Sequence, residues 1–276
     1  MEIDSLHILG YFGALAIGLV LGLVGSGGSL LAVPIFTYLF HISPITTTSY
    51  SLFVVGATSS VGVFKNFKKG WIDYSVAMVI AIPSIFMVFA TRKFIVPIIP
   101  DTLVLIGTFT LTGNKAILLF FAFLMIIASI SMIREKKRVT RTIKLICQSY
   151  FILISIGVII GLLSGIAGIG GGFLIVPALV LVGKLPMRKA VATSLFIISL
   201  KSLIGFTGDL SALEINWAFL MLFTLISFLG IFIGVYLSTY IEGENLKKSF
   251  GWVVLILAIG MLYKEVFIQV YPNCLP

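Results

Sequence analysis

The sequence predicts an all-α membrane protein, built from two inverted repeats of about five helical elements each, with a Gly-rich helix break in each repeat. Of its 276 residues, 59% are hydrophobic and only 11% are charged, whereas a soluble domain carries roughly 25% charged residues. One glycine-rich pattern also occurs twice, and most basic residues lie in short linkers between apolar runs. The hydrophobicity excludes a disordered chain, and the apolar runs lack the alternation of β-barrel strands.

The internal repeat has a fixed spacing of 143 residues. The stretch 22–34, GLVGSGGSLLAVP, aligns with the stretch 165–177, GIAGIGGGFLIVP. The same spacing pairs Ser51 with Ser194 and Gly62 with Gly205. Two unrelated glycine-rich loops would not keep one register over such a length. We therefore expect a first transmembrane repeat at 1–133, a basic cytoplasmic linker at 134–144 and a second transmembrane repeat at 145–276.

Each repeat contains five apolar elements. They are expected at 6–24, 29–40, 46–64, 72–91 and 116–133, and at 145–163, 173–183, 189–208, 215–237 and 249–263. A helix that crosses a bilayer needs about 20 residues, and the second element of each repeat is much shorter. The first two elements of each repeat therefore form either a broken helix or a re-entrant hairpin. The insert 94–114 is interrupted by Pro97, Pro100 and Gly113 and is expected to lie at a membrane interface.

The orientation follows from Lys and Arg. Fourteen of the 19 basic residues lie in four linkers, 65–69, 134–144, 184–189 and 238–248. These linkers share one side of the membrane if the first two elements of each repeat together make no crossing or two. The positive-inside rule then places them in the cytoplasm and both termini in the periplasm. The sequence thus predicts a multi-pass inner (plasma) membrane protein with oppositely oriented repeats, the plan of many secondary transporters.

The glycine runs are the first candidate for a binding site. A backbone that leaves the helix inside the bilayer is tolerated mainly where it is buried in protein or lines a cavity. The short helices after the runs would direct their N-termini, with a positive dipole end, at a bound anion. The motifs GxxxG at 18–22, 157–161 and 230–234 are assigned to helix packing instead. The candidate ligands from the breaks are Ser26, Gly27, Gly28, Ser29, Gly168, Gly170, Gly171 and Gly172.

Lys201 is the second candidate, because it lies within the apolar element 189–208. An ionisable residue inside a membrane is expensive and is a functional candidate by default. Its ammonium group could bind an anion, or it could extend to the membrane surface from a helix that ends early. Hydroxyl groups near it, or at the corresponding place in the first repeat, could donate hydrogen bonds to the same anion. These are Thr193, Ser194 and Ser202, and Ser51 and Ser59.

Other chemistry is not expected. Asp73 and Asp209 lie near predicted membrane ends and are interpreted as helix caps, and no carboxylate lies convincingly in mid-span. The two cysteines lack metal-ligand spacing, so we expect no metal and no cofactor. The glycine runs match neither the Walker A pattern GxxxxGK(S/T) nor the dinucleotide-binding pattern GxGxxG. The net charge of +9 comes mostly from the linkers and does not indicate nucleic acid. The sequence therefore predicts a protein that is not an enzyme.

The paired glycine–Val–Pro runs resemble the sulfite exporter TauE/SafE family of membrane permeases. The similarity is strongest over 161–208, GLLSGIAGIGGGFLIVPALVLVGKLPMRKAVATSLFIISLKSLIGFTG, and weaker over 18–62. In the first repeat Ser29 replaces the third glycine. The resemblance implies transport of sulfite or organosulfonate anions across the bacterial inner membrane, often outward. Its motifs carry over to Gly168, Gly170, Gly171, Gly172, Pro177, Thr193 and Ser194.

The residues alone predict a secondary transporter of a small anion that works by alternating access. That the anion contains sulfur is implied only by the family resemblance. An anion channel, a membrane-embedded scaffold, or a transporter of another small carboxylate or inorganic anion are the alternatives. The expected partners are the anion and the lipid bilayer. A coupling ion, either a proton or sodium, and assembly into a homo-oligomer stay open.

Overall fold

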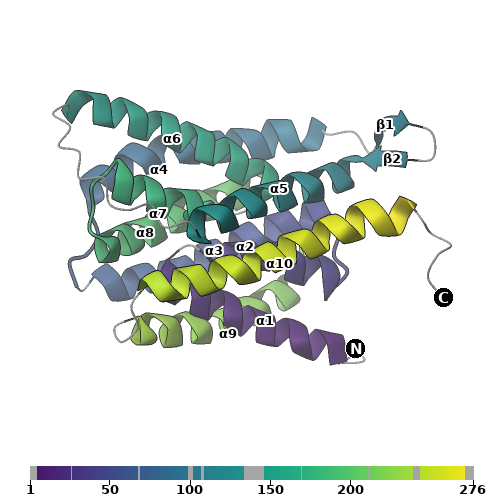
Figure 1. Cartoon of the computed structure of the whole chain (residues 1–276), viewed down its shortest axis with the longest axis horizontal. Coiled ribbons are helices and arrows are strands. Elements are labelled where there is room, and N and C mark those ends of the chain that lie inside the picture. Colours follow the sequence, from purple (N-terminus) through teal and green to yellow (C-terminus); the bar gives the residue numbers. More distant parts are fainter. Residues whose placement is uncertain are drawn as a thin grey trace.

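The computed structural model describes residues 5–25, 27–67, 69–98, 102–106, 109–133, 146–168, 170–210, 212–238 and 243–270. Within these residues the chain is a bundle of α-helices, which confirms the helical prediction (Figure 1). The first repeat contains α1 (Ser5–Val24), α2 (Ser29–Tyr38), α3 (Pro44–Phe67), α4 (Tyr74–Ala90) and α5 (Gly113–Ile133). The second contains α6 (Ile146–Ala167), α7 (Gly172–Leu181), α8 (Met187–Thr207), α9 (Trp217–Leu237) and α10 (Gly243–Val270).

The insert after α4 has a structure of its own. A π-helical turn, Thr91–Ile95, and a 3₁₀ turn, Val96–Ile98, prolong α4. The strands β1 (Thr102–Ile106) and β2 (Phe109–Thr112) then pair as an antiparallel hairpin, with Ile106 opposite Phe109. The sequence predicted the interruption but not the hairpin.

Among the residues that the structure describes, four helical segments are long and apolar enough to cross a membrane. They are Tyr74–Ile98, Gly113–Ile133, Met187–Thr207 and Trp217–Leu237, with mean hydropathies of 2.0, 2.8, 1.7 and 2.5. Shorter apolar helices occupy Ile8–Val24, Ser29–Tyr38 and Phe151–Ala167. Length and composition therefore identify a multi-pass membrane protein.

The short second element of each repeat turns back along the first. Gly10, near the start of α1, packs against Phe40, just past the end of α2, and Gly13 packs against Ile35. Such pairing requires α1 and α2 to run antiparallel. In the second repeat, Gly171 before α7 packs against Ile160 of α6. The structure thus resolves the alternative left by the sequence, since each pair is a hairpin.

The helix ends gather at two opposite ends of the bundle. The start of α1, the end of α10 and the β-hairpin lie at one end of the bundle (Figure 1). The connections from α3 to α4 and from α7 to α8 lie at the opposite end, together with the end of α9 and the start of α10. We call these the hairpin end and the linker end.

Glycines allow close helix contacts in both repeats. A Cβ on Gly18 of α1 would collide with the Ser227 carbonyl of α9. One repeat away, a Cβ on Gly161 of α6 would lie 2.7 Å from the Ser84 carbonyl of α4. Backbones approach closely where residues are small, so the assignment of these motifs to packing is confirmed.

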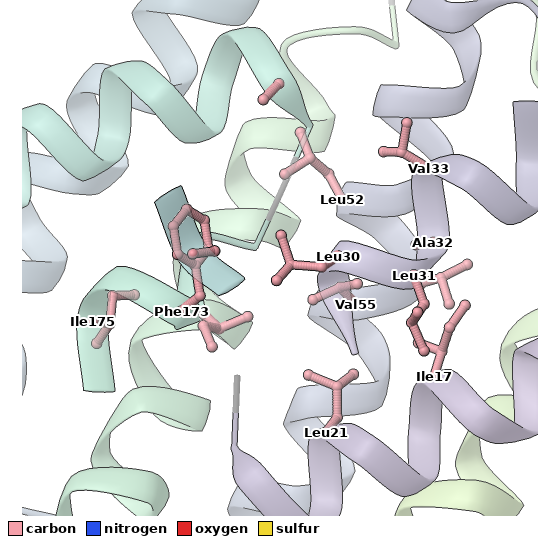
Figure 2. Close-up of a cluster of buried hydrophobic side chains, with 14 of the residues drawn as sticks. Ile17, Leu21, Leu30, Leu31, Ala32, Val33, Leu52, Val55, Phe173 and Ile175 are labelled. Atoms are coloured by element: carbon pink, nitrogen blue, oxygen red, sulfur yellow. The ribbon is translucent and has the colours of Figure 1, made fainter. Parts of the chain in front are cut away.

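Further contacts recur at the same spacing around the central pair α3 and α8. Gly62 of α3 packs against Leu195 and Ile231, and Gly205 of α8 packs against Leu52 and Val88. Every residue of the first set is 143 positions from a residue of the second. The buried apolar cluster between the repeats includes Ile17, Leu21, Leu30, Leu52, Val55, Phe173 and Ile175 (Figure 2).

Candidate anion site between the two helix hairpins

Glycine is required where each hairpin turns. Gly25 and Gly168 have φ values of +73° and +66°, a region that side chains with a Cβ rarely adopt. Gly25 lies against Val191 near the start of α8, and Gly168 lies against Thr48 near the start of α3. Neither contact leaves room for a Cβ. The two turns are therefore fixed at equivalent places, against opposite ends of the central helix pair.

From these turns the chain returns to the interior, where the starts of α2 and α7 come together. A Cβ on Gly170 would lie 3.4 Å from the Cβ of Ser29, the first residue of α2. It would also contact Val55 of α3 and Ile198 of α8. Helix N-termini present amide groups without intrahelical partners and a positive dipole end. Two such ends therefore converge beside the middle of α3 and α8.

Lys201 lies at this point. Its side chain is fully buried, and its Nζ has no hydrogen-bond partner among the residues that the structure describes. A Cβ on Gly171 would be only 2.5 Å from Nζ, so the ammonium group lies directly before the first turn of α7. The alternative in which Lys201 extends to the membrane surface does not fit this placement.

Buried hydroxyl groups lie on α8, which carries Lys201, and on its central partner α3. Ser51, Thr58 and Ser59 of α3 and Ser202 of α8 lack hydrogen-bond partners within the described part of the chain. Thr58 occupies the position in the first repeat that Lys201 occupies in the second. Buried polar groups without partners are rare and call for an explanation. A bound oxyanion would accept hydrogen bonds from such hydroxyls.

Two of the other predicted ligands, Ser194 and Thr193, use their hydroxyl groups to bond the protein backbone. The Ser194 hydroxyl donates to the carbonyl oxygens of Gly25 at 3.0 Å and Val191 at 2.8 Å, which holds the first turn onto α8. The Thr193 hydroxyl accepts a hydrogen bond from the Asp73 amide at 3.1 Å. Both hydroxyls therefore hold backbone elements in this arrangement.

The glycine break of the first repeat takes part in the site mainly through its backbone. Gly27 accepts the amide of Leu30 at 3.0 Å, and a Cβ on Gly28 would collide with the Ile17 carbonyl of α1. Gly172 begins α7 and is the counterpart of Ser29. Ser26 lies outside the described residues.

A second buried polar cluster was missed by the sequence reasoning. Arg92 is fully buried in the π-helical turn, and its Nη1 donates to Asp209 Oδ2 at 3.2 Å and to Thr48 Oγ1 at 3.0 Å. Asp73 caps α4 by accepting the Val76 amide at 3.1 Å, as predicted. The interpretation of Asp209 as only a cap is wrong, because its carboxylate forms the ion pair with Arg92.

The comparisons with known proteins identify one family and several membrane transporters as relatives. Residues 11–261 match the family model described as sulfite exporter TauE/SafE. A "Probable membrane transporter protein" of Xylella fastidiosa (strain Temecula1) is 28% identical over 96% of this chain and 98% of its own length. The "Probable membrane transporter protein YunE" of Bacillus subtilis (strain 168) is 25% identical over 95% and 99%. A relative with the same description from Methanocaldococcus jannaschii is 32% identical over 71% of each chain. No solved structure gives a significant match. The chain therefore belongs to the sulfite exporter TauE/SafE family of membrane transporters.

Proposed function

We propose that this transporter is a permease that moves a small sulfur-containing anion, such as sulfite or an organosulfonate, across the inner membrane by alternating access. The observation that supports it best is the buried Lys201 ammonium at the start of α7, which has no hydrogen-bond partner among the described residues. The choice of sulfur chemistry rests on the family. Neither an active site nor a cofactor is part of the proposal.

The physical reason is charge compensation. Removing an ammonium group from water costs several kcal/mol unless a partner of opposite charge and further hydrogen bonds replace the solvent. A sulfite or sulfonate group carries negative charge on several oxygen atoms. One oxygen could accept from Lys201 Nζ, and the others from buried hydroxyls such as Ser51, Ser59 and Ser202. The starts of α2 and α7 would add their dipoles.

Alternating access is supported by the equivalence of the two hairpins. Gly25 packs on Val191, and Gly168 packs on Thr48, at positions 143 residues apart. We infer an inverted pseudo-two-fold relation between the repeats. In the proposed mechanism, one hairpin moves away from its contact while the other remains packed. The anion then reaches the Lys201 site from one side at a time.

The charge distribution gives the proposed orientation. The linker end carries the basic segments 65–69 and 184–189, so we assign it to the cytoplasm. The start of α1 and the end of α10 would then face the periplasm. A small tag on either terminus of the protein in intact cells should be cleaved or labelled by a reagent that cannot cross the inner membrane. Protection of either tag until the cells are lysed would contradict this topology.

The substrate is tested with the purified protein in proteoliposomes. Sulfite, thiosulfate, sulfate, a sulfonate and a carboxylate are compared by thermal shift and by counterflow of labelled sulfite. We expect saturable counterflow and stabilisation by sulfite or the sulfonate. Stabilisation by the carboxylate alone would assign the other anion class, and flux without counterflow would indicate a channel. The same assay with a proton or sodium gradient tests the coupling ion.

A further inference from the structure

The Arg92 cluster lies apart from the Lys201 site and has no role in the function proposed above. Arg92 uses only Nη1, which is shared between Asp209 and Thr48. Its Nε and Nη2 are buried and lack partners among the residues with described positions. The hydroxyl of Thr91 is likewise buried and unpaired there.

The free atoms form the binding edge of the guanidinium group. Nε and Nη2 point in the same direction and match two oxygens of a carboxylate or other oxyanion. Asp209 does not occupy this edge, because its Oδ2 contacts Nη1. An ion pair that served only to hold the fold would leave two buried nitrogen donors of Arg92 unsatisfied, which costs free energy.

The second glycine break connects this cluster with the Lys201 site. Gly168 packs on Thr48, which bonds Arg92, whereas Gly171 packs on Lys201. Lys201 lies on α8 and Asp209 lies two residues past its end. Along the direction of this helix the two residues are separated by roughly 12 Å at a rise of about 1.5 Å per residue. One short stretch of backbone therefore contacts Lys201 directly and is connected to Arg92 through Thr48.

We propose that the Nε–Nη2 edge of Arg92, with the Thr91 hydroxyl, is a second oxyanion subsite at the hairpin end of the bundle. This subsite rests on the proposed function, because the transported anion would pass between the Arg92 subsite and the Lys201 site. Asp209 and Thr48 orient the guanidinium through Nη1. Asp209 also limits the affinity, since its charge repels the anion.

The test is sulfite titration of the purified full-length protein by calorimetry. The neutral pair Arg92→Gln with Asp209→Asn removes the guanidinium without leaving a buried charge unpaired, so this variant is expected to fold. We expect two sulfite ions per wild-type chain, and one for the neutral pair and for Lys201→Met. Asp209→Asn alone should keep two ions and bind the second at least fivefold more tightly.

The results separate this subsite from the proposed function. If the neutral pair binds sulfite with wild-type stoichiometry and affinity, the subsite is wrong, even if Lys201→Met loses an ion. If Lys201→Met changes nothing while the neutral pair loses an ion, the Lys201 site is wrong and the subsite stands. Weaker sulfite binding in Asp209→Asn, with a matching loss of thermal stability, would show that the Arg92–Asp209 ion pair only stabilises the fold. That result would overturn the proposal.

Discussion

Replacing Lys201 by methionine is expected to abolish sulfite counterflow and to weaken sulfite binding at the central site at least 30-fold. Methionine keeps the length and apolar character of the side chain but removes the ammonium group. Losing a buried charge partner costs about 2–5 kcal/mol, and each 1.4 kcal/mol is a tenfold change in affinity. Calorimetry and counterflow in proteoliposomes measure the two effects.

The same substitution should raise the stability of the protein without ligand. Lys201 is fully buried, and a lysine at the centre of a membrane helix costs about 2.5–3.5 kcal/mol. Methionine removes that cost, so the thermal midpoint without anion should increase while the shift produced by sulfite decreases. Lys189→Met is the matched control, because Lys189 lies exposed on the same helix. Equal sulfite affinity in both variants would remove Lys201 from the site.

Helix positions could be predicted from the sequence because apolar runs and glycine punctuation are local signals. The direction of the short elements could not, since an antiparallel hairpin and a broken helix share one hydropathy pattern. Contacts such as Gly10 with Phe40 decide between them, and they depend on tertiary packing. The β-hairpin was missed because it lies in an interrupted segment with no clear period.

The candidate site was predicted in part for similar reasons. Lys201 was recognised because a charge inside an apolar run is conspicuous. Arg92 was not, because it lies just beyond the end of the apolar run 72–91, where a charged residue is ordinary. Its partner Asp209 is 117 residues away. The sequence also could not show that the Ser194 hydroxyl bonds the Gly25 carbonyl, because residue type does not determine the direction of a hydroxyl.

Valine at position 171 is expected to block transport while leaving membrane insertion and expression unchanged. Gly171 has a φ of +64°, where a β-branched residue is strongly disfavoured. A Cβ there would also lie 2.5 Å from Lys201 Nζ and 2.9 Å from Ile160 Cγ2. The added side chain must therefore displace the ammonium group from the start of α7. Counterflow should fall to the background of empty liposomes, and sulfite binding at the Lys201 site should be lost.

Strain and obstruction can be separated with a second glycine of the same conformation. Gly70 has a φ of +63° but no atom within 4 Å of the place a Cβ would take. Alanine at position 70 therefore introduces only backbone strain, of about 1–3 kcal/mol, and should leave transport intact. Alanine at position 171 introduces the same strain and also fills the space beside Lys201. If both alanine variants transport sulfite equally well, the glycine break is needed only for the path of the backbone. If only the variant at 171 fails, the space beside the ammonium group is what the anion occupies.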